Sequence, residues 1–394
     1  MKSEWQTVRA ADFMDFNPRL SIKKGTVATQ ISMDKLRPFT KVVPSVEQAE
    51  FSGGTKFANG DTIVARITPC LENGKTAFVD CLKENEIAFG STEFIVLRAK
   101  PGVSDSQFVY YLATSPEFRN VAIKSMVGSS GRQRVQQLVL ENLELTVPKL
   151  PEQEKIGRFL AELDDKIALN ERVNDNLEQQ AATYFQELFI NNANPMWQIS
   201  TISDLGTVVG GSTPSKTKPE YYTNNGIAWI TPKDLSINKS KFISHGENDI
   251  TELGLKNSSA TVMPKGTVLF SSRAPIGYIA IASNEVTTNQ GFKSVIPYSE
   301  IGTAFVYFFL KHSLPVIESA ASGSTFKEIS GSAMKNIPAI IPDRNTLDQF
   351  NSFCAPIFAQ QKILEEQNHS LAMLRDSLLP KLMSGAIDIA SIQL

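Results

Sequence analysis

The sequence predicts an α+β protein in which two mixed α/β globules are separated by two long antiparallel helices that pair as a coiled coil. The chain has 394 residues, of which 42% are hydrophobic, enough for the cores of two or three domains. One long helical pattern occurs twice, and the stretch before each copy repeats one order of strands, short helices and a glycine-rich loop. We therefore expect an internal repeat with an approximate two-fold. Its expected segments are globules at 1–150 and 196–342 and spacer helices at 151–195 and 343–394.

The first globule combines both kinds of secondary structure. Gly60–Ile67 and Thr92–Leu97 are rich in β-branched residues and come after glycine-containing turns, which predicts strands. Ser106–Leu112 and Pro116–Met126 have apolar faces at helical spacing and predict short helices. The polar loop Gly128–Arg134 follows them.

A single long helix is predicted from Pro151 to Ile190. Its apolar positions alternate in steps of four and three residues, which keeps one seam facing a partner helix. At a rise of about 1.5 Å per residue, roughly 35 helical residues extend about 50 Å, too long for an ordinary core helix. We interpret the segment as a spacer. Its seam includes Ile156, Leu160, Leu163, Ile167, Asn174 and Leu177.

The second globule repeats the order of the first with little sequence identity. Gly266–Arg273 corresponds to the first predicted strand, and Asn289–Phe292 to the beginning of the second. Val306–Leu310 corresponds to the first short helix, and Gly323–Lys327 takes the place of the glycine-rich loop. The match in order predicts that both globules have the same fold.

The second long helix repeats the seam of the first after a shift of 194 residues, and Asn174 and Asn368 then coincide. A polar seam residue lowers stability but fixes register, so this match favours duplication of one paired element over two unrelated helices. Because the second helix must return along the first, we expect antiparallel pairing. Pro356 lies inside the seam and is expected to kink the helix or to start a new one. The seam residues of this helix include Ile357, Leu364, Asn368 and Leu371.

Several classes of protein do not fit the sequence. No segment is long and apolar enough for a membrane span, and the N-terminus has no apolar export signal, so we expect a cytoplasmic protein. Three cysteines without CxxC spacing and three scattered histidines predict neither a disulfide framework nor a metal site. A phosphate loop fails because Pro69 stands where its first glycine is required, and no methyltransferase or nuclease motif is complete. We expect no catalytic residue and no cofactor in this chain.

Both globules carry polar, basic and aromatic side chains of the kinds that contact phosphates and base edges. The density of these residues indicates a DNA-binding surface; for example, 118–140 contains basic residues and no acid. Arg66 and Arg273 are expected to end equivalent strands, with Thr68 and Ser271 nearby. The two glycine-rich loops have the flexibility for close backbone approach to a phosphate, although plain turns fit them equally well.

Taken singly, each basic residue could equally be a solvated surface charge, and each aromatic residue could belong to a core. The candidate DNA contacts of the first globule are Lys23, Lys24, Arg37, Lys56, Arg66, Thr68, Lys75, Ser129, Ser130, Arg132 and Arg134. Those of the second globule are Lys216, Lys218, Tyr221, Lys233, Ser271, Arg273, Asn289, Gln290, Ser324 and Lys327.

Three segments resemble the specificity subunits of type I restriction-modification systems. They are Leu150–Ile156, which reads Leu-Pro-Glu-Gln-Glu-Lys-Ile, then Ser377–Gly385 at the end of the second helix, and Phe57–Thr76 in the first globule. The similarity extends over essentially the whole chain. The doubled helix that follows a proline is its most specific feature, whereas the strands of the globules alone would be a weak signal.

The resemblance implies two target-recognition domains, each reading one half of a gapped site in double-stranded DNA. The helices would act as a ruler and dock two methyltransferase subunits, which carry S-adenosylmethionine and methylate adenine. Restriction subunits that use ATP and Mg would complete the nuclease. This chain would have no active site, and its acidic first helix, with nine acids against four bases in 151–190, would be a protein-binding surface. In isolation the helices could also support self-association.

Three alternatives remain open at this stage. A coiled-coil scaffold whose globules bind protein would show no salt-dependent binding of DNA by the assembled complex. An enzyme with an unrecognised site would methylate DNA without partners. Related restriction systems use similar specificity chains with a fused methyltransferase-nuclease partner. The recognised DNA sequence does not follow from residue types, because readout depends on the pose and on DNA deformability.

Overall fold

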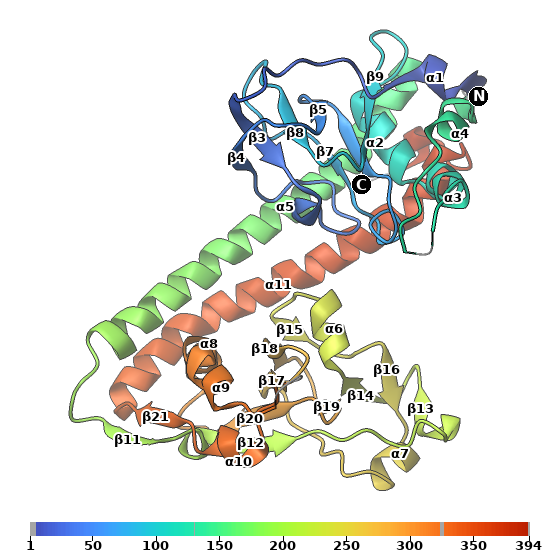
Figure 1. The fold of residues 1–394 in the computed structure, drawn as a ribbon. Coiled ribbons are helices and arrows are strands. Elements are labelled where there is room, and N and C mark those ends of the chain that lie inside the picture. The colour runs from blue at the N-terminus through green and yellow to red at the C-terminus, as the bar shows by residue number, and fades with distance from the viewer. Residues whose placement is uncertain (1–4, 130, 324–326, 393–394) are drawn as a thin grey trace. The chain divides into compact units, whose positions relative to one another are not determined.

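The computed structural model describes residues 5–129, 131–323 and 327–392 (Figure 1). The chain forms two compact units. Unit 1 comprises Met1–Leu169 with Gln367–Leu394, and unit 2 comprises Asn170–Glu366. Each unit therefore contains one globule and one segment of each long helix. In the described part of the chain, no helix is long and apolar enough to cross a membrane.

Unit 1 contains three small sheets. In the first, β1 (Gln6–Arg9) pairs antiparallel with β10 (Glu144–Val147), which leads into the first long helix. The second sheet has the order β2 (Met14–Phe16), β9 (Phe94–Ala99), β6 (Thr62–Ala65) and β7 (Thr76–Phe78). The third has the order β4 (Glu47–Glu50), β3 (Val27–Ile31), β8 (Ala88–Gly90) and β5 (Thr55–Phe57).

Two consecutive helices follow the second sheet of unit 1 in the chain; the first packs on β6, β7 and β9, and the second packs on the first. The Asp105 side chain accepts the Phe108 N–H and caps α2 (Ser106–Thr114), and Ser115 caps α3 (Pro116–Lys124) in the same way. Both lie where the sequence predicts helices. Six consecutive residues of α2 are buried, so this helix forms the centre of the unit 1 core. The shorter helices of the unit are α1 (Ala10–Phe13) and α4 (Gln137–Glu141).

Unit 2 contains the counterparts of these sheets. Its two-stranded sheet pairs β11 (Gln198–Thr201) with β21 (Pro338–Ile341). A five-stranded sheet has the order β12 (Gly206–Gly210), β20 (Lys293–Pro297), β17 (Val268–Ser272), β18 (Ile276–Ala282) and β15 (Phe242–Ile243). A four-stranded sheet has the order β13 (Tyr222–Thr223), β16 (Asn248–Ile250), β14 (Ile227–Ile230) and β19 (Thr287–Thr288). The helices are α6 (Pro232–Ile237), α7 (Glu252–Lys256), α8 (Thr303–His312), α9 (Leu314–Ala320) and α10 (Gly331–Lys335).

The backbone confirms the predicted fold class and internal repeat. In both units a glycine with φ 88° precedes the central strand: the N–H of Gly60 donates to Val79, and that of Gly266 to Ala282. Arg66 and Arg273 each directly follow one of these equivalent strands, but they are one position out of register with each other. The N–H groups of Arg66 and Ser272 make the equivalent bonds to the neighbouring strand. Similar sequence letters at a strand end do not fix register, whereas the backbone ladder does.

The two long helices are α5 (Leu150–Gln186), which ends in a π-helical turn at Glu187–Asn191, and α11 (Arg344–Met383). In unit 1 the Asn368 side chain donates to the Ile167 carbonyl, and Arg375 donates to Asp164. In unit 2 Gln361 donates to the Asn174 carbonyl, and Gln349 to the Tyr184 hydroxyl. Residue numbers rise along one helix as they fall along the other, so the segments are antiparallel in each unit.

Of the two effects expected of Pro356, the start of a new helix is wrong. Helix α11 starts at Arg344, twelve positions earlier, and runs through the proline to Met383. Pro356 and Ser352, the residue one turn before it, are both exposed. The carbonyl that loses its donor is therefore on the solvent side, while Cys354 and Ile357 hold the opposite face in the core.

The predicted seam positions differ in burial. Ile156, Leu160 and Leu163 belong to the same core cluster as Leu379 and Leu382 of α11. Buried seam residues in unit 2 are Ile357 and Leu364, and half-buried positions are Ile167, Asn174, Leu177, Asn368 and Leu371. Phe185 and Phe189 are buried beside the seam and were not predicted.

Candidate nucleic-acid interface

In unit 1 a hairpin is fixed beside the end of strand β6. Val127 and Arg134 exchange backbone hydrogen bonds of 3.0 and 2.9 Å, which closes the loop between them. The Thr68 N–H donates to the Gln133 carbonyl at 3.0 Å and holds the loop against the strand end. Gly128 has a φ of 137°, and a Cβ there would lie 2.9 Å from the Arg132 carbonyl, so the tight turn requires glycine.

This arrangement brings together several of the predicted contacts. The Arg134 guanidinium donates to both carboxylate oxygens of Glu93, at 2.5 to 3.0 Å. These bonds hold the pKa of Glu93 below its ordinary value, and the charge of Arg66 adds to the effect. Arg66 Nε and the Thr68 hydroxyl are buried and find no hydrogen-bond partner among the described residues. Ser129 and Arg132 are exposed on the loop.

Unit 2 has a corresponding loop beside the end of β17. Ser322 and Glu328 exchange backbone hydrogen bonds of 3.1 and 2.9 Å. The Glu328 backbone also forms a β-bridge with Arg273. The Ile329 N–H donates to the Ser272 carbonyl at 3.1 Å, so the loop is held at the same end of the strand as in unit 1. Lys327 is exposed. The predicted contacts Ser130 and Ser324 lie outside the described residues.

The polar groups around this second loop form one cluster. Glu328 lies between Arg273 Nη1 at 3.4 Å and Lys293 Nζ at 3.6 Å. The Ser272 N–H donates to the Gly291 carbonyl at 2.7 Å, which places the Asn289 turn against the strand end. Asn289 Oδ1 accepts the Gly291 N–H at 2.8 Å, and exposed Gln290 accepts the hydroxyl of Thr213.

Three charged residues of these clusters were not predicted from the sequence: Glu93, Lys293 and Glu328. The two ion-paired partners are 41 residues apart in unit 1 and 55 residues apart in unit 2, so no local pattern marks them. These three residues are identified by the backbone β-bridges between each loop and its strand end, which the sequence alone does not reveal.

Other predicted contacts lie on separate elements. Lys23, Lys24, Arg37 and Lys216 are exposed. The Lys56 ammonium lies 5.0 Å from the centre of the Phe51 ring, Lys218 donates to the Tyr221 hydroxyl at 3.1 Å, and Lys233 pairs with Glu247 at 2.7 Å.

Three of the predicted side chains are engaged inside the globules. Ser271 is fully buried; its hydroxyl donates to the Pro275 carbonyl and accepts the Tyr278 N–H, both at 2.8 Å. Tyr221 is 5% exposed, and Lys75 donates to the Met33 carbonyl at 2.9 Å. These three side chains are therefore not part of the surface proposed for DNA.

Each globule is joined to the long helices by a buried lysine at an equivalent backbone position. Lys41 is 3% exposed and donates to Asp165 at 3.0 Å. Lys241 is 7% exposed and donates to Glu178 and, at 2.6 Å, to Gln361. Burial raises the pKa of Glu178, but Lys241 and Lys311 outweigh it, so that pKa lies below its ordinary value.

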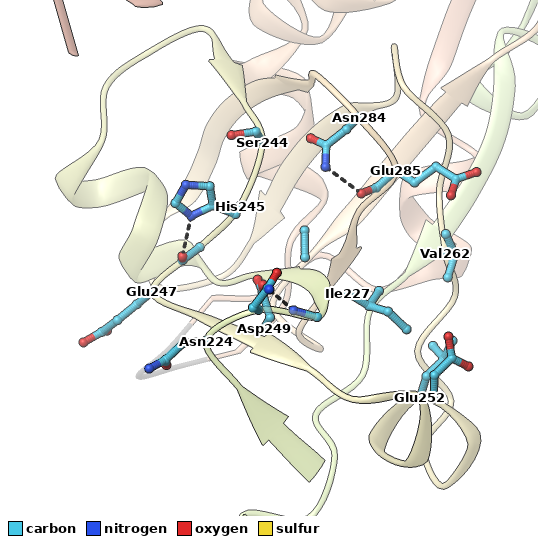
Figure 2. Close-up of a pocket in the computed structure, with 15 residues that line it drawn as sticks. Asn224, Ile227, Ser244, His245, Glu247, Asp249, Glu252, Val262, Asn284 and Glu285 are labelled. Atoms are coloured by element: carbon cyan, nitrogen blue, oxygen red, sulfur yellow. Dashed lines mark hydrogen bonds between the residues drawn. The ribbon is translucent and has the colours of Figure 1, made fainter. Parts of the chain in front are cut away.

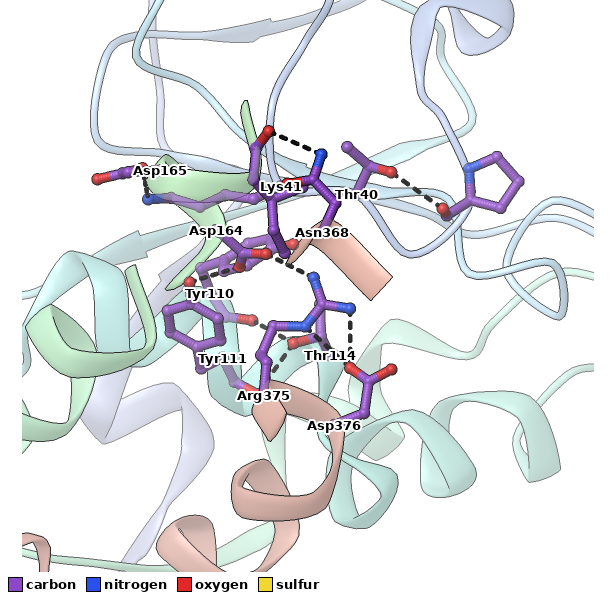
Figure 3. A network of polar contacts seen from close by, with 12 residues as sticks. Thr40, Lys41, Tyr110, Tyr111, Thr114, Asp164, Asp165, Asn368, Arg375 and Asp376 are labelled. Atoms are coloured by element: carbon purple, nitrogen blue, oxygen red, sulfur yellow. Dashed lines mark hydrogen bonds and ion pairs between the residues drawn. The ribbon is translucent and has the colours of Figure 1, made fainter. Parts of the chain in front are cut away.

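Unit 1 has a second buried polar network against α11 (Figure 3). Asp164 is 5% exposed; it accepts the Tyr111 hydroxyl at 2.6 Å and Arg375 Nη1 at 2.5 Å. Arg375 also donates to Asp376 at 2.8 Å. Burial, followed by the charge of Asp164, raises the pKa of Tyr111 well above its ordinary value, so the hydroxyl remains the donor. These contacts fix the globule on both helices of its unit.

A cavity with a volume of about 930 Å³ lies in unit 2 (Figure 2). Its lining includes His245 and four acids, Glu247, Asp249, Glu252 and Glu285. The structure groups no three potential metal ligands among the residues that it describes. Because phosphates are repelled by carboxylates, this cavity does not extend the candidate DNA surface.

Two divergent copies of a globule-and-helix unit, each with a loop fixed beside a charged strand end, define a duplicated modular recognition protein. A family profile described as "Type I restriction modification DNA specificity domain" matches residues 2–179 and 194–368. The chain belongs to this family and is a type I restriction-modification specificity subunit with two target-recognition domains.

Individual relatives agree with this assignment. The chain is 43% identical over 162 residues to the MjaIX specificity subunit of Methanocaldococcus jannaschii, a match covering 41% of this chain and 37% of that protein. It is 24% identical to the HindI specificity subunit of Haemophilus influenzae, over 83% of this chain and 86% of the relative. The crystal structure of a type I S subunit from M. genitalium has the same fold, with a TM-score of 0.58, 17% identity and 96% coverage of both chains.

Proposed function

We propose that the chain is the non-catalytic subunit that gives a type I restriction-modification complex its DNA sequence specificity. Each globule reads one half of a gapped bipartite site. The observation that carries this proposal is the loop fixed beside a charged strand end, which occurs once in each globule. Cations at such a surface attract phosphates, and neighbouring amide and hydroxyl groups can bond to base edges. Two readers on one chain suit a site with two halves.

The proposed contacts combine loop, strand-end and other surface residues. In the first globule they are Lys23, Lys24, Arg37, Lys56, Arg66, Thr68, Ser129, Arg132 and Arg134. In the second they are Lys216, Lys218, Lys233, Arg273, Asn289, Gln290 and Lys327.

The long helices set the spacing between the half-sites and dock two methyltransferase subunits. The excess of acids along 151–190 supports a protein-binding role for this surface, because it disfavours phosphates. The methyltransferase partners supply S-adenosylmethionine, and the restriction partners supply ATP and Mg chemistry. This chain contributes recognition and assembly.

The direct test is a base-resolution map of modified adenines in the source genome, with and without this gene. We expect loss of one two-part motif that is methylated on opposite strands across a fixed gap. An unchanged map from a strain that expresses the assembled complex would contradict the proposal.

Arg132→Ala and Lys327→Ala test the loop surfaces directly. Each should weaken DNA binding several-fold and reduce the salt dependence by about one ion, because one phosphate contact is lost. Binding is measured across a salt series with the complex assembled. Lys83→Ala and Lys265→Ala are matched controls, since both lysines are exposed beyond the opposite ends of the central strands. Unchanged affinity for the loop variants would reject these two contacts.

A further inference from the structure

Each globule holds one carboxylate between cations at the surface proposed for DNA. In unit 1, Glu93 accepts three hydrogen bonds from Arg134 and also feels the charge of Arg66. In unit 2, Glu328 lies between Arg273 and Lys293. The Glu93 side chain is 23% exposed and that of Glu328 is 36% exposed, so both can be reached from solvent.

The two clusters occupy the same place in the fold with opposite polarity. In unit 1 the backbone of Arg134 forms a β-bridge with that of Ile67. In unit 2 the backbone of Glu328 forms the equivalent β-bridge with that of Arg273. The loop therefore supplies the cation in the first globule and the acid in the second. Both globules have a carboxylate–arginine ion pair at this place, although the two residues come from different elements. This points to a role for the carboxylate beyond holding one particular arginine.

A carboxylate at a phosphate-binding surface needs a physical reason, because it repels the DNA backbone. The partly exposed pair of Glu328 with Arg273, at 3.4 Å, adds little to stability. The bidentate pair of Glu93 with Arg134 can also support its loop, but support alone does not explain why an acid recurs in both globules. In the major groove, however, carboxylates accept hydrogen bonds from the exocyclic amino groups of cytosine and adenine. A carboxylate has about four acceptor positions, and two Arg134 N–H groups, of which Nε–H is shared between both oxygens, occupy at most three of those on Glu93. One acceptor position is left for a base.

We propose that Glu93 and Glu328 are specificity-determining residues, one for each half-site. Each accepts a hydrogen bond from the amino group of a cytosine or adenine in its half-site. Where the contacted position holds guanine or thymine, which present an acceptor there, the carboxylate meets no donor, repels the backbone and keeps its neighbouring cations paired. The carboxylate therefore lowers affinity for unrelated DNA and raises the preference for the correct site. This inference rests on the proposed function, since it presupposes that both surfaces meet DNA.

The test uses Glu93→Gln and Glu328→Gln in the assembled complex, with half-sites taken from the map of modified adenines. Glutamine keeps the size of the side chain and removes its charge. We expect affinity for unrelated duplex DNA to rise about tenfold at low salt, with a salt dependence steeper by about one ion, because a cation is released to a phosphate. Affinity for the correct site should fall about tenfold, because the charge-assisted hydrogen bond from the base amino group is replaced by a weaker one to a neutral amide oxygen.

Glu84→Gln and Glu285→Gln are the controls. Glu84 is exposed beyond the far end of β7, and Glu285 lines the acidic cavity. Both should leave the two affinities unchanged. If the wild-type complex shows no salt-dependent binding of DNA, the proposed function fails. If it selects its site, and Glu93→Gln and Glu328→Gln select it equally well, only the present inference is overturned.

A charge swap separates recognition from simple support of the loop. The double variant Glu93→Arg with Arg134→Glu keeps an ion pair in unit 1 but gives it the polarity found in unit 2. We expect this variant to assemble and bind DNA with changed base preference in one half-site, read from the adenines that it methylates. Recovery of the wild-type preference would mean that the pair only holds the loop, and would overturn the inference.

Discussion

At the scale of single residues, buried charges join each globule to its helices. Glu178 forms ion pairs with Lys241, whose side chain is 6% exposed, and with Lys311, whose side chain is 43% exposed. Glu178→Gln leaves the Lys241 ammonium buried without its counter-ion, which should lower the free energy of unfolding by about 3 kcal/mol or more. Lys241→Met should cost less, because Glu178 keeps Lys311. Urea unfolding of both variants gives the comparison, and equal losses would contradict this assignment of roles.

The same carboxylate predicts how stability depends on pH. The pKa of Glu178 in the folded chain is below the ordinary value of 4.5. The folded state therefore binds a proton less readily than the unfolded state, and the stabilisation is complete above pH 4.5. It is lost as the pH falls through the folded pKa. Thermal unfolding of the wild type between pH 6 and pH 3 should show a steeper loss than Glu178→Gln, whereas parallel curves would contradict this origin.

At the scale of elements, the seam of α5 contains a polar residue that the pairing does not fully satisfy. The Asn174 carbonyl accepts the Gln361 side chain at 3.1 Å, but Asn174 Oδ1 is buried without a partner among the described residues. Asn174→Leu should therefore raise the free energy of unfolding by about 1 kcal/mol, while weakening the control of register. Asp175→Leu, at an exposed neighbouring position, is the control. A loss of stability in Asn174→Leu would show that the amide is needed in place.

The helices and central strands could be predicted from the sequence because their signals are local. The spacing of the seam residues predicted α5 and α11, and runs of β-branched residues after a glycine predicted β6 and β17. A new helix at Pro356 was a wrong alternative, because the effect of a proline depends on which side of the helix faces water, and periodicity alone does not reveal that side. The clusters around Glu93 and Glu328 could not be predicted, since they depend on which loop bridges to which strand end. Burial of Ser271 likewise follows from strand register and not from residue type.

At the scale of the whole molecule, the duplication means that each unit depends on both halves of the sequence. The unit 1 core contains Ile156 and Leu160 from α5 together with Leu379 and Leu382 from α11. After the shift of 194 residues, 364–382 of α11 corresponds to 170–188, which comprises the second half of α5 and the start of its π-helical turn. A chain ending at residue 195 therefore retains a segment that could replace the missing helix, but only by pairing with a second copy.

We therefore predict that residues 1–195 form a dimer that lacks a partner for one buried charge. In the full chain, buried Asp164 pairs with Arg375, and the position that corresponds to Arg375 in the first helix is Ala181. In the dimer, Asp164 of each copy would face Ala181 of the other and remain without its cation, which is costly for a buried charge. Ala181→Arg should restore the pair and tighten the dimer about tenfold or more, or about 1.4 kcal/mol for each factor of ten. Sedimentation across a dilution series measures this change, with Ala182→Arg as the control. A monomeric half-chain, or equal dissociation constants for the two arginine variants, would show that the halves do not pair through the duplicated seam.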